Sequence, residues 1–122
     1  MTLALRATAF VTLIAIMVLL LGPATSVELD PAYPSVDKAA HFIAFGILLW
    51  TFGVLVPTQR RIALALFAVL VGGLIEVIQG WTGRDAEWLD FAADAAGVAT
   101  ALGVWAFWRN FQPRRARRQV LS

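Results

Sequence analysis

The chain has 122 residues, of which 60% are hydrophobic and 15% are charged, and its formal net charge is +2. A soluble domain of this length could not bury so much apolar surface, so the composition excludes an ordinary soluble protein and indicates a lipid environment. The sequence contains no cysteine, which excludes disulfide bonds, thiolate metal sites and cysteine nucleophiles.

Four apolar stretches predict transmembrane helices, because each is close to the ~20 residues that a helix needs to cross ~30 Å of hydrocarbon. They cover residues 3–22, 39–56, 62–79 and 89–108. No stretch alternates polar and apolar residues with period two, which argues against a transmembrane β-barrel. We therefore predict an all-α fold, an integral membrane bundle of four transmembrane helices over residues 1–108, followed by a basic tail over residues 109–122.

The first stretch has a second interpretation. Arg6 followed by an apolar run that ends at Gly22 and Pro23 also resembles a signal peptide. The run is longer than a usual signal-peptide core and no clear A-x-A cleavage site follows it. We expect it to be retained as a packing or lipid-facing helix; cleavage would leave three spans and an outer N-terminus.

Charge orients the predicted bundle. Lys38 and Arg84 lie at one end of the spans, and all the acidic residues lie at or near the same end. The other basic residues lie at the opposite end: Arg6, Arg60, Arg61, Arg109, Arg114, Arg115, Arg117 and Arg118. The positive-inside rule then predicts that both the N-terminus and the C-terminus are cytoplasmic, in an inner (cytoplasmic) membrane of bacterial type. The basic tail is expected to contact anionic lipid headgroups and no nucleic acid.

Polar side chains gather at the predicted outer ends of the last three spans. They form pairs that are three or four residues apart, so each pair lies on one face of its helix: Asp37 with His41, Glu76 with Gln79, and Asp90 with Asp94. Successive hairpins can bring these faces together. Because ionisable groups inside a membrane are costly, we expect a single polar cluster that is paired, hydrated or functional.

Small residues favour close helix packing next to this cluster. Ala93, Gly97 and Ala101 recur at intervals of four in the last span, and Gly72 and Gly73 lie in the third. Such spacing lets neighbouring helix backbones approach each other in a membrane.

The motifs resemble those of the VanZ-like membrane protein family over roughly residues 37–103. They are Asp37-Lys38-x-x-His41-Phe42, Gly73-x-x-Glu76-x-x-Gln79, and Arg84 followed by Asp90-x-x-x-Asp94-x-x-Gly97. The family takes its name from a protein associated with low-level resistance to teicoplanin, a glycopeptide that acts on the cell envelope. The resemblance implies a role in the envelope without fixing an activity, and it does not carry resistance over to this chain.

One position departs from the family pattern. The family often has asparagine where this chain has Asp94. The additional carboxylate favours cation binding or acid–base chemistry over a role that needs a neutral amide.

The cluster predicts two kinds of site residue. Candidate catalytic residues are His41, Glu76, Asp90 and Asp94. Candidate substrate-binding residues are Asp37, Lys38, Gln79 and Arg84, in which Lys38 and Arg84 would hold an anionic headgroup and Gln79 would orient the ligand.

The chemistry itself is left open by the residues. One imidazole with several carboxylates suits Zn²⁺ or Mn²⁺, and carboxylates alone suit Mg²⁺ or Ca²⁺, but no H-E-x-x-H signature supports a metal. Metal-free acid–base catalysis, with His41 as partner of a desolvated carboxylate, is the next option. A proton- or cation-coupled transporter built on Glu76 is a further class, which the strong charge asymmetry disfavours.

We predict a VanZ-like integral membrane protein whose outer-side polar site binds or processes an envelope lipid or an amphipathic compound. Whether it is an enzyme, and its oligomeric state, are left open. The alternative is a noncatalytic structural or interaction module whose polar cluster stabilises the bundle.

Overall fold

The computed structural model describes residues 1–23, 35–83 and 87–111 of the chain. Within these ranges the fold is all-α and consists of α1 (Leu3–Leu21), α2 (Val36–Leu55), α3 (Arg61–Trp81) and α4 (Trp88–Phe111). All four helices are long and apolar enough to cross a membrane, which indicates a multi-pass membrane protein.

The helices follow the four predicted stretches, with two shifts. Helix α2 begins at Val36, so Asp37 and Lys38 belong to its first turn, and α4 continues to Phe111. Two of the helix ends expected from glycine and proline agree with the structure: α1 ends before Gly22, and α2 ends before Val56 and Pro57. The loop expected from Gly80 begins later, because α3 continues to Trp81.

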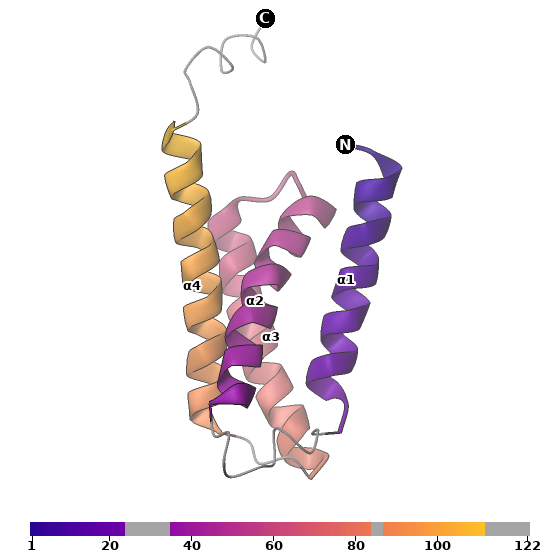
Figure 1. Cartoon of the computed structure of the whole chain (residues 1–122), viewed down its shortest axis with the longest axis vertical. Coiled ribbons are helices and arrows are strands. Elements are labelled where there is room, and N and C mark those ends of the chain that lie inside the picture. The colour runs from indigo at the N-terminus through magenta and orange to yellow at the C-terminus, as the bar shows by residue number, and fades with distance from the viewer. Residues whose placement is uncertain (24–34, 84–86, 112–122) are drawn as a thin grey trace, which may run out of the picture.

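Figure 1 shows the helices running up and down, with the N-terminus, the connection between α2 and α3, and the end of α4 at one end of the bundle. Helix α2 packs most extensively against α4, and α1 lies at the edge, mainly against α2. The shared core is formed by apolar side chains from all four helices, among them Leu20, Phe45, Leu48, Ala68, Ile75 and Val98.

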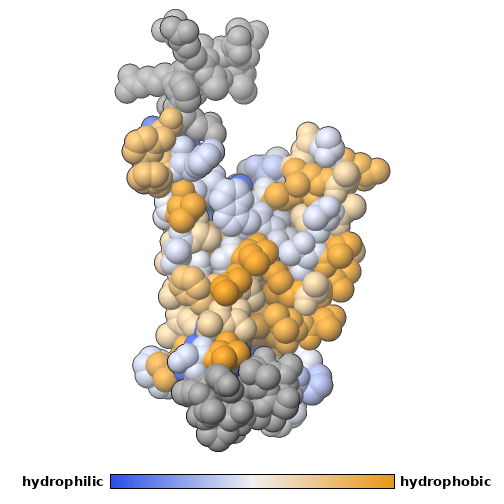
Figure 2. Space-filling model, viewed as in Figure 1, coloured by the Kyte–Doolittle hydropathy of each residue, from blue (hydrophilic) through white to orange (hydrophobic). Residues whose placement is uncertain are grey.

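Apolar side chains also cover the outside of the bundle. Figure 2 shows them over α1 and across the middle of the face in view. Leu70 is 72% exposed and Val18 is 66% exposed, values that a soluble bundle would not place on its flanks. A bilayer solvates these side chains, so the outer surface agrees with the membrane assignment.

Basic and aromatic side chains meet at the end of the bundle that carries the chain's N-terminus. The Arg61 guanidinium lies 5.5 Å from the ring centroids of both Trp50 and Trp105, and that of Arg109 lies 4.8 Å from Trp105. These are cation–π distances. Tryptophan and arginine gathered at one level are typical of a membrane interface.

The contact between α2 and α4 depends on Gly97. A Cβ atom at this position would overlap the backbone carbonyl of Phe42, and a backbone cannot move aside as a flexible side chain can. The absence of a side chain at Gly97 therefore allows the backbones of α2 and α4 to come into contact, as the small-residue spacing of α4 predicted.

We expect Gly97→Ala to destabilise the bundle by about 1–3 kcal/mol, the usual range for overpacking. Gly103→Ala is the matched control on the same helix, because a Cβ atom there would meet nothing within 4 Å. Reversible unfolding of both variants in mixed micelles measures the difference. Equal stability of the two variants would contradict the close approach of α2 and α4.

Candidate functional site

The polar residues predicted from the sequence come together at the end of the bundle opposite the cation–π contacts. His41 and Asp94 each lie in the second turn of their helices, and Glu76 lies five residues before the end of α3. At 1.5 Å per residue, the cluster is about 8 Å inside the helix ends. His41 is 1% exposed, Asp94 0% and Asp90 2%, so the bundle encloses these groups almost completely.

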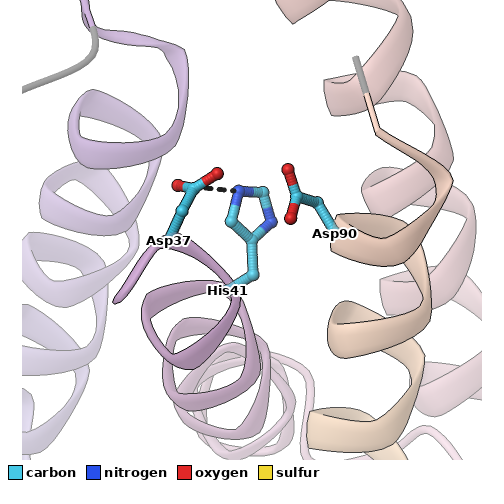
Figure 3. Close-up of side chains that lie close together, drawn as sticks. All are labelled: Asp37, His41 and Asp90. Carbon is cyan, nitrogen blue, oxygen red and sulfur yellow. Dashed lines mark ion pairs between the residues drawn. The ribbon is translucent and has the colours of Figure 1, made fainter. Parts of the chain in front are cut away.

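His41 is the centre of the cluster. Its Nδ1 atom lies 2.7 Å from Asp94 Oδ1 and 3.8 Å from Glu76 Oε1, while its Nε2 atom lies 3.8 Å from Asp37 Oδ1. Figure 3 shows the imidazole between the carboxylates of Asp37 and Asp90. One side chain of α2 thus contacts acidic groups of α2, α3 and α4.

The His41–Asp94 contact links the state of the imidazole to that of the carboxyl group. When Asp94 is ionised, its oxygens can only accept hydrogen bonds, so Nδ1 carries a proton and donates to Asp94 Oδ1. In the neutral ring, Nε2 then presents a lone pair. This bond joins α2 to α4 about one turn away from Gly97, which packs against the backbone of Phe42.

Lys38 is paired with acidic groups at the mouth of the cluster. Its Nζ atom donates to Glu87 Oε2 at 2.8 Å and lies 3.5 Å from Asp90 Oδ1. The lysine charge is therefore balanced within the chain, and this geometry gives no support to its predicted role as an anion holder. Glu87 was not among the predicted site residues, although its place three residues before Asp90 was the available signal.

Gln79 faces α1. Its Nε2 atom donates to the backbone carbonyl of Leu20 at 2.6 Å, and the side chain is buried. That carbonyl belongs to the last turn of α1, where helix carbonyls lack partners within the helix. The predicted orienting amide thus secures α1 to α3.

Several atoms of the cluster are buried without a hydrogen-bond partner among the residues that the structure describes. They are His41 Nε2, both carboxylate oxygens of Glu76, Asp90 Oδ1 and Asp94 Oδ2. A buried polar atom without a partner costs about 1–3 kcal/mol. So many in one place indicate a site that is completed by a proton, water, an ion or a ligand.

The charges of the cluster lead to the same conclusion. Within the described ranges, the cationic partners of this acidic group are Lys38 and, when protonated, His41. The acidic residues are Asp37, Glu76, Glu87, Asp90 and Asp94. Fully ionised, the group would carry a negative excess inside an apolar bundle, which requires protons or a cation.

The structure thus brings Glu76, Asp90 and Asp94 close to the imidazole of His41, which completes the predicted catalytic set. Asp37 and Lys38 lie beside this group. Gln79 lies in the same helix turn as Glu76 but is directed to α1. Arg84, the remaining predicted binding residue, lies outside the described residues.

Comparisons of the chain with protein-family models, curated proteins and solved structures find no match. The VanZ-like resemblance therefore depends on the sequence motifs alone.

We expect Asp94→Ala to destabilise the protein by about 2 kcal/mol relative to Asp94→Asn, because the alanine variant leaves His41 Nδ1 buried without an acceptor. The asparagine side chain keeps a carbonyl oxygen that can accept the same hydrogen bond. Unfolding in mixed micelles measures both variants. If the two were equally stable, the His41–Asp94 bond would not hold α2 against α4.

Proposed function

We propose that this chain is a VanZ-like protein of the inner membrane that binds an envelope lipid or amphipathic compound at its outer-side polar cluster. The observation that carries the proposal is a cavity of about 280 Å³ whose lining includes Glu76, a residue with both carboxylate oxygens buried and without a hydrogen-bond partner among the described residues. The cavity is lined by Gly73, Glu76, Glu87, Trp88 and Phe91.

This cavity has two chemical halves. Glu76 connects it to the His41 cluster, and Glu87 adds a second carboxylate. Trp88 is 76% exposed and forms the outer part of the wall with Phe91. A molecule with a polar head and an apolar body fits such a lining, and it can enter sideways from the lipid between α3 and α4.

The lining also favours one kind of headgroup. Carboxylates accept hydrogen bonds, so they recognise hydroxyl and amino groups. Lys38 is already engaged by Glu87 and Asp90, which leaves no described cation directed at a phosphate in this cavity. We therefore propose a headgroup with hydroxyl or ammonium donors, such as a glycosylated or amine-bearing envelope lipid.

If the bound compound is processed, the buried groups Glu76 and His41 are the candidates for proton transfer. Glu76 lines the cavity and lies within 3.8 Å of His41 Nδ1, which in turn contacts Asp94. A carboxyl group and an imidazole at this separation can exchange a proton with a hydroxyl held between the cavity and the cluster.

A noncatalytic structural module is the second candidate. Three polar contacts between elements favour it, namely His41 with Asp94, Lys38 with Glu87, and Gln79 with Leu20. Each joins two parts of the bundle. Such a network would stabilise the fold without any ligand, but within the described ranges both oxygens of Glu76 have no hydrogen-bond partner in it.

For the topology, we propose that the cluster faces outward and both termini are cytoplasmic. Since the chain has no cysteine, single cysteines give an unambiguous test. In intact spheroplasts, a membrane-impermeant maleimide should label Thr82→Cys, beyond α3, and should label Thr58→Cys, between α2 and α3, only after lysis. The opposite pattern would reverse the orientation.

For the ligand, we expect the wild-type protein, purified from its own membrane, to carry a lipid adduct in native mass spectrometry. Glu76→Gln should reduce its occupancy about tenfold or more through loss of a charge-assisted hydrogen bond. Gly73→Leu should have a similar effect by filling the cavity, because even its Cβ atom would lie 3.6 Å from Phe91.

Gly103→Leu is the matched control, since its Cβ atom would meet nothing within 4 Å. It should carry the adduct at the wild-type level. Equal occupancy in all three variants would remove the cavity as the binding site. A structural network instead predicts that Glu76→Gln lowers stability and leaves the adduct unchanged.

A further inference from the structure

The nitrogen Nε2 of His41 is one of the buried atoms that the proposed lipid site does not use. Its ring partner Nδ1 is bound to Asp94, and Nε2 itself has no hydrogen-bond partner among the described residues. With the residue 1% exposed, water has little access to this lone pair. An unprotonated imidazole nitrogen is among the commonest metal ligands in proteins.

Two carboxylates flank this nitrogen. Asp37 Oδ1 lies 3.8 Å from Nε2, and one ligand atom from each of Asp37, His41 and Asp90 lies within 4.8 Å of the others. Figure 3 shows the imidazole between the two acidic side chains, with Asp37 one turn before it on α2 and Asp90 on α4. Ligands about 2.1 Å from one ion lie roughly 3.0–3.5 Å apart, so a contraction of about 1 Å would bring all three into coordination.

We propose that His41 Nε2 and the carboxylates of Asp37 and Asp90 bind a divalent cation of the Zn²⁺ or Mn²⁺ class. One imidazole with two carboxylates is a mixed nitrogen and oxygen donor set, which suits these ions better than Mg²⁺ or Ca²⁺. Asp94 is a positioning residue for this site, since it accepts the proton of Nδ1 and thereby directs Nε2 toward the ion.

The surroundings fit a cation. Lys38 offsets part of the acidic charge near Asp90, at 3.5 Å, but the cluster as a whole still has more carboxylates than cationic side chains in the described ranges. The Asp37 side chain is 25% exposed, which gives an ion a route from the end of the bundle. Three protein ligands leave coordination positions for water or a polar headgroup.

A second group of ligand atoms shares the same histidine. His41, Glu76 and Asp94 also have ligand atoms within 4.8 Å of one another. Binding there through Nδ1 would break the 2.7 Å bond to Asp94, whereas binding through Nε2 breaks no hydrogen bond of the imidazole in the described structure. The geometry therefore favours the site at Asp37 and Asp90.

This inference shares the cluster with the proposed lipid site but goes beyond it, and the two are measured separately. The full-length protein, without an affinity tag, is dialysed with equimolar ZnCl₂ or MnCl₂, freed of unbound ion by gel filtration, and analysed for bound metal. We expect about one ion per chain in the wild type, in keeping with a single three-ligand site.

Asp37→Asn is the sharpest variant, because Asp37 is partly exposed in the first turn of α2 and its amide is isosteric. Asp37→Asn and Asp90→Asn each remove a proposed ligand and should weaken metal binding by more than about tenfold. Asp94→Asn changes a residue outside the ligand set and should weaken metal binding by about tenfold. Glu76→Gln should bind the metal as the wild type does. Circular dichroism and elution volume confirm that each variant is folded.

Absence of bound Zn²⁺ and Mn²⁺ from folded wild type would overturn the proposal. So would wild-type binding by folded Asp37→Asn and Asp90→Asn, or loss of metal in Glu76→Gln alone, which would place the ion at Nδ1. A visible Co²⁺ spectrum that is present in wild type and absent in Asp37→Asn would support the assignment independently of affinity. Loss of the lipid adduct in Gly73→Leu with metal retained would separate the two sites.

Discussion

The hydrogen bond between His41 and Asp94 is the interaction on which the polar end of this bundle depends. It joins α2 to α4 at 2.7 Å between two side chains that are almost completely buried. In an apolar surrounding neither group is tolerated alone, because each would be a desolvated polar group with no partner. Their pairing makes it possible for the remaining acidic groups to gather around the same imidazole.

Close backbone packing makes that bond possible. Phe42 follows His41 directly, and Gly97 is three residues after Asp94, so the place where α2 and α4 touch lies next to the bond. A side chain at position 97 would separate the helices and with them the imidazole and its acceptor. The small residue and the polar pair are thus one structural unit, although they look like unrelated features in the sequence.

The polar side chains of the cluster fall into two groups, those with hydrogen-bond partners in the described part of the chain and those with buried atoms that have none. Gln79 and Lys38 have partners in the chain and hold α1 and the start of α4 in place. The Glu76 carboxylate oxygens and His41 Nε2 are buried with no hydrogen-bond partner in the described ranges. Glu76 lies on the Nδ1 side of the imidazole, whereas Nε2 is directed to the other side, toward Asp37. The first group is explained by stability alone, whereas the second favours a bound species, a headgroup on the Glu76 side and a cation on the Nε2 side.

The sequence by itself determined the four helices and the faces that carry polar groups. Span length follows from composition, and the spacing of Asp37 with His41 and of Asp90 with Asp94 follows from the helical repeat, which is the same in every helix. The tertiary structure alone decided which groups meet across helices: Asp94 at Nδ1, Glu87 at Lys38, and Gln79 at α1. These pairings depend on how each helix is rotated and how closely it approaches its neighbour, and that is set by packing over the whole bundle rather than by local periodicity.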